Sequence, residues 1–370
     1  MDFIPIAKPY IGEEEAEAVY RQVKSGWISM GQKVKEFENA VCEYLGVTHA
    51  IAMNSGTATL HAALIALGVG PGDEVILPTL SFISSANAVI SCRATPVFCE
   101  VDPRTFNVTS ETMQTVMTSR TKVLMPVDLK GQPVDYDTLN KLANESGIAV
   151  LSDSAESFGA IYKGHKTGGQ CRVHSFSFFA NKSITTGEGG VVTTDDAEVA
   201  EKCQLIRTQG QSERYVHVDI GYNYRLTDVS AALGVAQLGR IEWIMEEKER
   251  IAKSYNGAFA GHPLIKVPSV PEYVNRPSWY MYCLTLDKRI NKDNVLKLMK
   301  TQGVDYRLSF PPIHLQPIYR KLFNYHKGDF PISEAVFNRF IDIPCWVGMT
   351  QEQMERVVKV VISSVERSEE

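Results

Sequence analysis

The stretch HAIAMNSGTATLHAALIALG, residues 49–68, indicates the class of fold. Its first part, residues 49–55, is a short apolar run of the kind that forms a buried strand. Its second part, residues 57–68, keeps apolar side chains at helical spacing over three turns. Gly56 and Thr57 lie at the junction, where the strand passes directly into the helix. A strand followed at once by a helix is the repeating unit of α/β folds.

The same alternation continues through the first two-thirds of the chain. Further strands are expected at residues 73–78, 95–102, 122–129, 148–154, 174–179 and 189–194. Further helices are expected at residues 84–92, 109–117 and 135–147. This spacing predicts one mostly parallel sheet of seven strands, with helices on both faces.

The character of the sequence changes near residue 240. A long charged helix is expected at residues 240–259, followed by a proline-rich segment and a shorter alternation that ends in a helix at residues 350–366. We therefore expect a large domain over residues 1–245 and a smaller α+β domain over residues 246–370.

Composition narrows the possible partners. The chain has 370 residues, of which 44% are apolar and 22% charged, as in a folded globular protein. A net charge of −5 favours neither a nucleic-acid nor a membrane partner. Seven scattered cysteines without a C-x-x-C pair indicate neither a disulfide framework nor a zinc site. With no signal-peptide pattern and no apolar run of about 20 residues, a cytoplasmic protein is expected.

The segment SFSFFANKSITTGEGG, residues 175–190, places one lysine, Lys182, between aromatic and hydroxyl side chains after an expected strand. The common motifs that would explain such a segment are missing. The chain has no G-x-x-x-x-G-K-[ST] or G-x-G-x-x-G nucleotide motif, no G-x-S-x-G hydrolase elbow and no H-E-x-x-H zinc motif.

An acid stands where it could act together with this lysine. Asp153 comes at the end of the expected strand 148–154, and ligands of open α/β sheets bind at the carboxyl ends of the strands. Pyridoxal phosphate needs this pair of groups, because a lysine binds it covalently and an aspartate keeps its ring nitrogen protonated. Once released, Lys182 could move a proton as general base and acid.

Other residues suit the remaining parts of such a cofactor. Gly56 and Thr57, at a helix N-terminus, could bind its phosphate, and Ser177 offers a second hydroxyl. Phe82, after another strand, could stack on its ring. Each residue also has an ordinary explanation: a surface lysine, a helix cap, a helix start or a core phenylalanine. Their joint order along the chain is what favours a cofactor site.

Four segments of the sequence resemble one known family. The segments NSGTATL, LSDSAES, SFSFFANKSITTGEGG and GYNYRLTDVSAALGVAQL resemble the DegT/DnrJ/StrS-type nucleotide-sugar aminotransferases over nearly the whole chain. The resemblance implies the aspartate-aminotransferase fold (fold type I) and pyridoxal 5'-phosphate as cofactor. It also implies a ping-pong reaction that moves an amine, usually from L-glutamate, to a keto carbon of a nucleotide-linked sugar.

The resemblance assigns roles to the cofactor residues. Lys182 would be the covalent lysine, Asp153 the partner of the pyridine nitrogen and Glu156 the neighbour of the ring hydroxyl. Phe82 would be the stacking aromatic. The phosphate contacts would be Gly56, Thr57 and Ser177.

Three further positions carry over from the family. Asn223 resembles the asparagine that reaches the phosphate from the neighbouring subunit, which implies a homodimer with shared active sites. Arg225 and His314 resemble substrate-side residues. From the residues alone, Asn223 and Arg225 could equally be turn and surface residues.

One branch of the family matches in more detail. FFANKSITTGEGG and SGWISMGQKVKEFE are similar to GDP-perosamine synthases, which aminate carbon 4 of GDP-4-keto-6-deoxymannose. An aminotransferase acting on a UDP- or dTDP-linked 3- or 4-keto sugar remains open, as does delivery to an O-antigen, another polysaccharide or a small metabolite. Where many relatives read V-H-L-Y-G, this chain has VDLKG, with Asp128 and Lys130, and the substrate contacts could differ there.

Two other functions are less consistent with the sequence. A 3-dehydratase branch of the family typically replaces the lysine with histidine, whereas this chain keeps Lys182. A non-catalytic regulator that binds DNA should show a helix-turn-helix and a basic surface, and the net charge here is negative. Catalysis is therefore the favoured interpretation.

Overall fold

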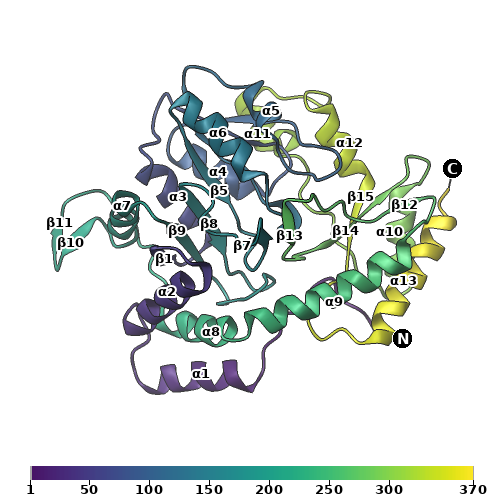
Figure 1. Cartoon of the computed structure of the whole chain (residues 1–370), viewed down its shortest axis with the longest axis horizontal. Helices are drawn as coiled ribbons and strands as arrows, with labels where there is room; N and C mark the ends of the chain where they lie inside the picture. Colours follow the sequence, from purple (N-terminus) through teal and green to yellow (C-terminus); the bar gives the residue numbers. More distant parts are fainter. Residues whose placement is uncertain (1, 370) are drawn as a thin grey trace.

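The computed structural model describes residues 2–369, and its centre is a seven-stranded sheet (Figure 1). The strands lie in the order β1-β9-β8-β5-β4-β2-β3. β9 is antiparallel to both of its neighbours, and the other pairings are parallel. The seven strands are β1 (His49–Met53), β2 (Glu74–Pro78), β3 (Thr95–Cys99), β4 (Thr121–Leu124), β5 (Ala149–Asp153), β8 (Val173–Ser177) and β9 (Gly190–Thr194). The expected mostly parallel seven-stranded sheet is confirmed.

Helices cover both faces because successive side chains of each strand point to opposite sides. In β1, Ile51 and Met53 pack into one core, while Ala50 and Ala52 pack into another. The first face is covered by α3 (Gly56–Ala66), α4 (Ile83–Ser91) and α7 (Ala197–Arg207). The second is covered by α2 (Gln32–Leu45), α5 (Ser110–Gln114), α6 (Tyr136–Ser146) and α8 (Asp228–Leu238). Helix α1 (Glu13–Lys24) lies against α8.

The long helix α9 (Ile241–Phe259) leads from this sheet to a second, smaller core (Figure 1). That core is built on an antiparallel sheet in the order β12-β14-β15. Its elements are β12 (Ile265–Lys266), β14 (Tyr282–Leu286), β15 (Phe340–Ile343), α10 (Lys292–Thr301) and α13 (Gln351–Glu366). The helices expected at residues 240–259 and 350–366 are therefore present.

Short elements complete the fold. β6 (Ile161–Tyr162), β7 (His165–Lys166) and β13 (Val274–Arg276) form a three-stranded sheet, and β10 (Gln211–Glu213) and β11 (Val216–His217) form a hairpin that extends from the body at the left of Figure 1. The 3₁₀ turns η1 (Leu129–Gly131) and η2 (Ile313–Leu315) and the helices α11 (Pro317–Phe323) and α12 (Pro331–Arg339) complete the described elements.

Chain segments cross the expected boundary at residue 245 in both directions. β13, from beyond the boundary, pairs with β6. Tyr319 packs on Phe98 in the main core, with ring centroids 5.7 Å apart. Near the amino end, Ile4 forms a bridge with Val304. The division into residues 1–245 and 246–370 stays a prediction.

Between residues 2 and 369, no helix combines the length and the apolar character needed to cross a membrane. All seven cysteines are unpaired thiols.

Candidate active site

A cavity of about 410 Å³ opens at the carboxyl ends of the parallel strands. Asp153 ends β5 and Ser177 ends β8, and both contribute to its wall. Seven of the ten predicted site residues line it, namely Gly56, Thr57, Phe82, Asp153, Glu156, Ser177 and Lys182. Residues more than 100 positions apart therefore meet where the strand topology predicts a ligand.

Lys182 follows β8 in a tight turn, in which its backbone N–H donates to the carbonyl of Phe179 at 2.9 Å. Its side chain is only 12% exposed. The amine lies 3.8 Å from Glu156 Oε1 and 4.2 Å from the centre of the Tyr280 ring. This is a half-enclosed amine between a carboxylate and an aromatic face, unlike a solvated surface lysine.

Asp153 is buried at the floor of the cavity. Its Oδ2 accepts a hydrogen bond from Ser85 Oγ at 2.7 Å, and its Oδ1 accepts one from the backbone N–H of Ala155 at 3.3 Å. Burial raises the pKa of Asp153, while these two hydrogen bonds and the positive charge of Lys182 act in the opposite direction. Over residues 2–369 Asp153 forms no ion pair, since the nearby Lys182 amine pairs with Glu156 instead, and a protonated pyridine nitrogen would give Asp153 a direct cationic partner.

Glu156 faces the lysine from the loop after β5. Its Oε2 accepts a hydrogen bond from the backbone N–H of Lys130 at 2.7 Å. Burial raises the pKa of Glu156, and the neighbouring charges of Lys182 and Lys130 lower it. The Glu156 carboxyl group can therefore accept a proton, or share one with a ring hydroxyl, at a low cost in free energy.

The N-terminus of α3 forms an anion seat opposite Lys182. Ser55 caps the helix by accepting from the N–H of Ala58 at 3.1 Å, and the first-turn N–H groups of Gly56 and Thr57 have no intrahelical partner. A Cβ on Gly56 would lie 2.8 Å from the Cβ of Ser177. Glycine thus lets the end of β8 approach, so that the Ser177 hydroxyl joins the helix N-terminus in one cradle.

Phe82 supplies an aromatic wall. It precedes the first turn of α4, is 53% exposed, and contacts Phe310 with ring centroids 5.3 Å apart. An exposed ring on a cavity wall offers a face for stacking, and it is not the core residue that the ordinary explanation would require.

Three of the predicted site residues do not line the cavity. Asn223 is exposed and forms a backbone bridge with Thr208, and Arg225 forms one with Met53. His314 is fully buried, with Nδ1 2.6 Å from Thr79 Oγ1 and Nε2 3.1 Å from Glu334 Oε1. Both ring nitrogens of His314 are thus occupied within the protein, and the geometry gives no support to its expected contact with substrate.

The two residues of VDLKG that differ from the pattern of many relatives, Asp128 and Lys130, are both buried inside the protein. Asp128 is fully buried, and it accepts hydrogen bonds from the hydroxyls of Tyr136 and Ser157 at 2.6 Å. Lys130 is buried and pairs with both oxygens of Asp342 at 2.8 and 2.7 Å. Neither side chain lines the cavity. Their effect is on the packing around Glu156 rather than a direct substrate contact.

Several residues that line the cavity carry no sequence signal, and Arg307 and Tyr280 are the two with the most direct bearing on its chemistry. Arg307 and Tyr280 line it from the second core. The Asn181 amide is best oriented with its oxygen toward Arg307 Nη1 and Nη2, at 3.0 and 2.9 Å, and its nitrogen donating to the Tyr280 hydroxyl at 3.2 Å. Tyr280 stands in a strand-like run that reads as core, and no motif marks Arg307.

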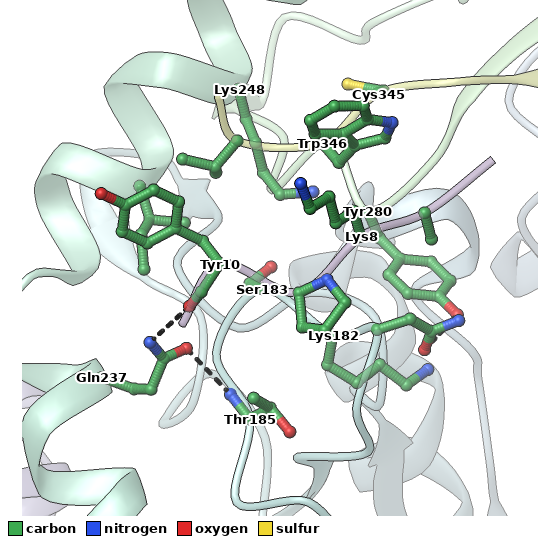
Figure 2. Close-up of a pocket in the computed structure, with 15 residues that line it drawn as sticks. Lys8, Tyr10, Lys182, Ser183, Thr185, Gln237, Lys248, Tyr280, Cys345 and Trp346 are labelled. Carbon is green, nitrogen blue, oxygen red and sulfur yellow. Dashed lines mark hydrogen bonds between the residues drawn. The ribbon is translucent and has the colours of Figure 1, made fainter. Parts of the chain in front are cut away.

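A second, much smaller pocket of about 30 Å³ lies behind Lys182 (Figure 2). It shares Lys182, Asn181 and Tyr280 with the main cavity. Lys248 and Trp346 line its other side, as Figure 2 shows. Side chains of α9 and of the carboxyl-terminal part of the chain thus form the pocket wall that faces the Lys182 segment.

These groups fit pyridoxal phosphate. The cavity offers the amine of Lys182, the buried carboxylate of Asp153, the N-terminus of α3 and the exposed ring of Phe82, and the cofactor has a carbonyl, a ring nitrogen, a phosphate and a flat face to match. The cradle at Gly56 is the most specific of these observations, because a Cβ there would close it.

Comparison with known proteins agrees with this site. The chain is 40% identical over 362 residues to GDP-perosamine synthase of Caulobacter vibrioides, with 96% of each chain covered. It is 35% identical over 375 residues to the spore coat polysaccharide biosynthesis protein SpsC of Bacillus subtilis, with 97% of this chain and 96% of SpsC covered. Among solved structures, Helicobacter pylori PseC, an aminotransferase of pseudoaminic acid biosynthesis, superposes with a TM-score of 0.94 at 28% identity, covering 99% of this chain and 100% of PseC. The model of the DegT/DnrJ/EryC1/StrS aminotransferase family matches residues 9–362. The chain therefore belongs to that family, and it is a pyridoxal-phosphate-dependent aminotransferase.

Proposed function

We propose that the protein moves the amino group of L-glutamate onto carbon 4 of GDP-4-keto-6-deoxymannose, forming GDP-perosamine. The observation that carries the amine-transfer chemistry is the position of Lys182, whose amine lies between Glu156 and Tyr280 in a cavity that also holds Asp153. The choice of sugar is supported by the relatives from Caulobacter vibrioides and Vibrio cholerae named GDP-perosamine synthase, at 40% and 34% identity.

Lys182 would bind the cofactor covalently and, once released, move the proton. Bound pyridoxal phosphate supplies an electron sink for the bond that breaks at the amino-acid α-carbon. Asp153 would hold the ring nitrogen protonated, and Glu156 would lie beside the ring hydroxyl. Lys182 would take the α-proton of glutamate in the first half of a ping-pong reaction and return a proton to the sugar carbon in the second.

Arg307 is our candidate for binding an anionic group of the substrates. Among the cavity-lining residues, the cationic side chains are Lys182 and Arg307. When Lys182 holds the cofactor, Arg307 remains for a carboxylate or a phosphate, and its planar group suits either. Its neighbours Asn181 and Tyr280 offer it no negative charge, which leaves that charge to a ligand.

A homodimer with shared sites is part of the proposal. Asn223 is exposed and outside its own cavity, as expected of a residue that reaches a neighbour's phosphate. The unpaired thiols support placing the enzyme in the cytoplasm.

A related activity is the second candidate, because the relatives carry mixed names. The enzyme would then act on a UDP- or dTDP-linked 3- or 4-keto sugar. Purified protein loaded with cofactor should be given glutamate and a panel of GDP-, UDP- and dTDP-linked keto sugars. We expect kcat/KM for GDP-4-keto-6-deoxymannose to exceed the others by at least about tenfold. Higher values with UDP or dTDP sugars would select the second candidate.

A further inference from the structure

The connection between β13 and β14 passes beside Glu156 and Lys182, two of the residues that line the cavity. Its residues Ser278, Trp279 and Tyr280 form what we call the 278–280 segment. Ser278 lies against the backbone of Glu156, and Tyr280 lies against Lys182. A shift of this segment would therefore be felt at both residues.

Ser278 fixes one end of the segment. Its hydroxyl donates to the carbonyl of Glu156 at 2.5 Å, and its backbone N–H donates to the carbonyl of Gly131 at 2.8 Å. Gly131 has a φ of +84°, and a Cβ there would lie 2.0 Å from Ser278 Oγ and 3.1 Å from the backbone nitrogen of Tyr280. Ser278 can therefore approach residue 131 this closely only because residue 131 is a glycine.

Trp279 has a left-handed backbone with φ of +50°, which is unfavourable for a bulky residue. The carbonyl of Trp279 accepts a hydrogen bond from Lys248 Nζ at 2.9 Å. Lys248 is 5% exposed, and over residues 2–369 its amine forms no ion pair with a carboxylate. Burial lowers the pKa of Lys248. Burying the Lys248 amine without an ion pair costs free energy, and so does the left-handed backbone of Trp279. That both are kept indicates that the hydrogen bond between them is needed.

Tyr280 ends the segment at the catalytic lysine. Its ring centre lies 4.2 Å from Lys182 Nζ, within the range of a cation–π contact. Its hydroxyl lies 3.2 Å from Arg307 Nη1. Figure 2 shows Lys248 on one side of this arrangement and Lys182 on the other, with Tyr280 between them.

We propose that Lys248 is a positioning residue for catalysis: by binding the Trp279 carbonyl it holds the left-handed turn that sets the Tyr280 ring against Lys182. The ring then keeps the released amine close to the carbons between which it moves a proton. This inference rests on the proposed function of Lys182, and it adds two residues, Lys248 and Tyr280, that neither motif nor composition marks.

The test is a double-mutant cycle in the cofactor-loaded enzyme. Lys248→Met and Tyr280→Leu should each lower kcat of the glutamate half-reaction by about tenfold or more, with KM for glutamate within about threefold of the native value. The double variant should show no greater loss of kcat than the less active of the two single variants, because both substitutions disrupt the same placement of the Tyr280 ring against Lys182. Lys248→Arg should restore most of the rate. Losses that multiply in the double variant would overturn the proposal.

Lys292 offers a matched control. Lys292 is partly buried, and its amine, like that of Lys248, donates to a backbone carbonyl: it bonds the carbonyl of Phe337 at 2.6 Å, away from the cavity. Lys292→Met should leave kcat within about twofold. An equal loss in Lys292→Met would mean that removing any buried lysine has this effect, and it would contradict a specific role for Lys248.

A second readout needs no turnover. In cofactor-free protein, the rate at which trinitrobenzenesulfonate modifies Lys182, measured by peptide mass spectrometry, should rise about fivefold in Lys248→Met and Tyr280→Leu, since the ring no longer covers the amine. Unchanged labelling in both would overturn the proposal even if the native protein transfers no amine. Should Lys248→Met fail to fold, Tyr280→Leu and Lys248→Gln carry the same readouts.

Discussion

Asp153 and Lys182 illustrate how far single residues can be assigned from sequence. Both were placed by type and position, an acid at a strand end and a lysine in a hydroxyl- and glycine-rich turn, and both line the cavity. Their immediate partners could not be foreseen. Ser85 of helix α4 binds Asp153 at the end of β5, and Tyr280 covers Lys182 from about 100 residues further along the chain. Such partners depend on tertiary packing, for which local sequence has no signal.

Arg307 is the residue whose change should act on substrate binding alone. Replacing Arg307 with Gln removes the remaining cavity cation, and a lost charge-assisted hydrogen bond to a carboxylate should raise KM for glutamate about 30-fold or more. Steady-state kinetics over a wide range of glutamate concentrations would measure this. Arg104→Gln is the control, since Arg104 pairs with Asp102 away from the cavity. An unchanged KM in Arg307→Gln would show that another group binds the carboxylate.

Asp128 should make stability depend on pH. Burial raises the pKa of Asp128 to about 6 from an ordinary value of 3.8, against the effect of its hydrogen bonds from Ser157 and Tyr136. The folded state therefore holds this proton to higher pH than the unfolded state, and stability is lost as pH rises from about 4 to 6. One pKa unit corresponds to about 1.4 kcal/mol, so the loss is about 3 kcal/mol.

Asp128→Asn should remove this dependence. Urea unfolding at several values between pH 4 and pH 7 should show the free energy of unfolding of the variant rising relative to the native protein by about 3 kcal/mol over that range. Parallel curves for the two proteins would mean that Asp128 titrates alike in the folded and unfolded states.

At the scale of elements, the alternation of strands and helices can be predicted from the sequence because hydrophobic periodicity and turn residues are local patterns. The helices expected at residues 57–68, 84–92 and 135–147 and most of the expected strands lie close to the observed bounds, but the strands expected at residues 95–102 and 122–129 end earlier, at Cys99 and Leu124. Helix α2 was not expected. The backbone N–H groups of Gly31 and Val34, at its start, donate to Asp228, which stands 194 residues or more away in the chain. A cap supplied by another element leaves no capping pattern in the local sequence.

The junction of β1 and α3 should control cofactor affinity. Gly56→Ala would put a Cβ 2.8 Å from the Cβ of Ser177 and force the two sides of the phosphate cradle apart. The dissociation constant for pyridoxal phosphate, measured by absorbance titration of cofactor-free protein, should rise about tenfold or more. Gly257→Ala, in α9 with no atom within 4 Å of the added carbon, should leave it unchanged. Equal affinity in both variants would argue against the cradle.

At the scale of the whole molecule, the second core completes the site. Tyr280 and Arg307 come from beyond residue 245 and enter the cavity formed by the main sheet. Asn223 remains outside, on the exposed surface. The sequence alone could not show which of these residues act within one chain and which act between chains, since that depends on how the parts pack.

Shared sites can be tested by complementation. Lys182→Ala and Asn223→Ala should each have low activity alone. If Asn223 serves the neighbour's site, unfolding and refolding the two variants together restores one native site in each mixed dimer, and about a quarter of native activity returns by random pairing. Activity no higher than the average of the two variants would place Asn223 outside the partner's site, or would show that the chain does not dimerise.

The central claim is that Lys182 binds pyridoxal phosphate and that this linkage carries amine transfer. The most direct measurement is the visible absorbance spectrum of the native protein and of Lys182→Ala, each incubated with the cofactor, before and after addition of glutamate. We predict a yellow native protein that glutamate bleaches, releasing 2-oxoglutarate, and a Lys182→Ala variant that folds but shows neither the lysine-linked band nor turnover. A native protein that stays colourless with the cofactor, or a variant that turns over at the native rate, would contradict the account.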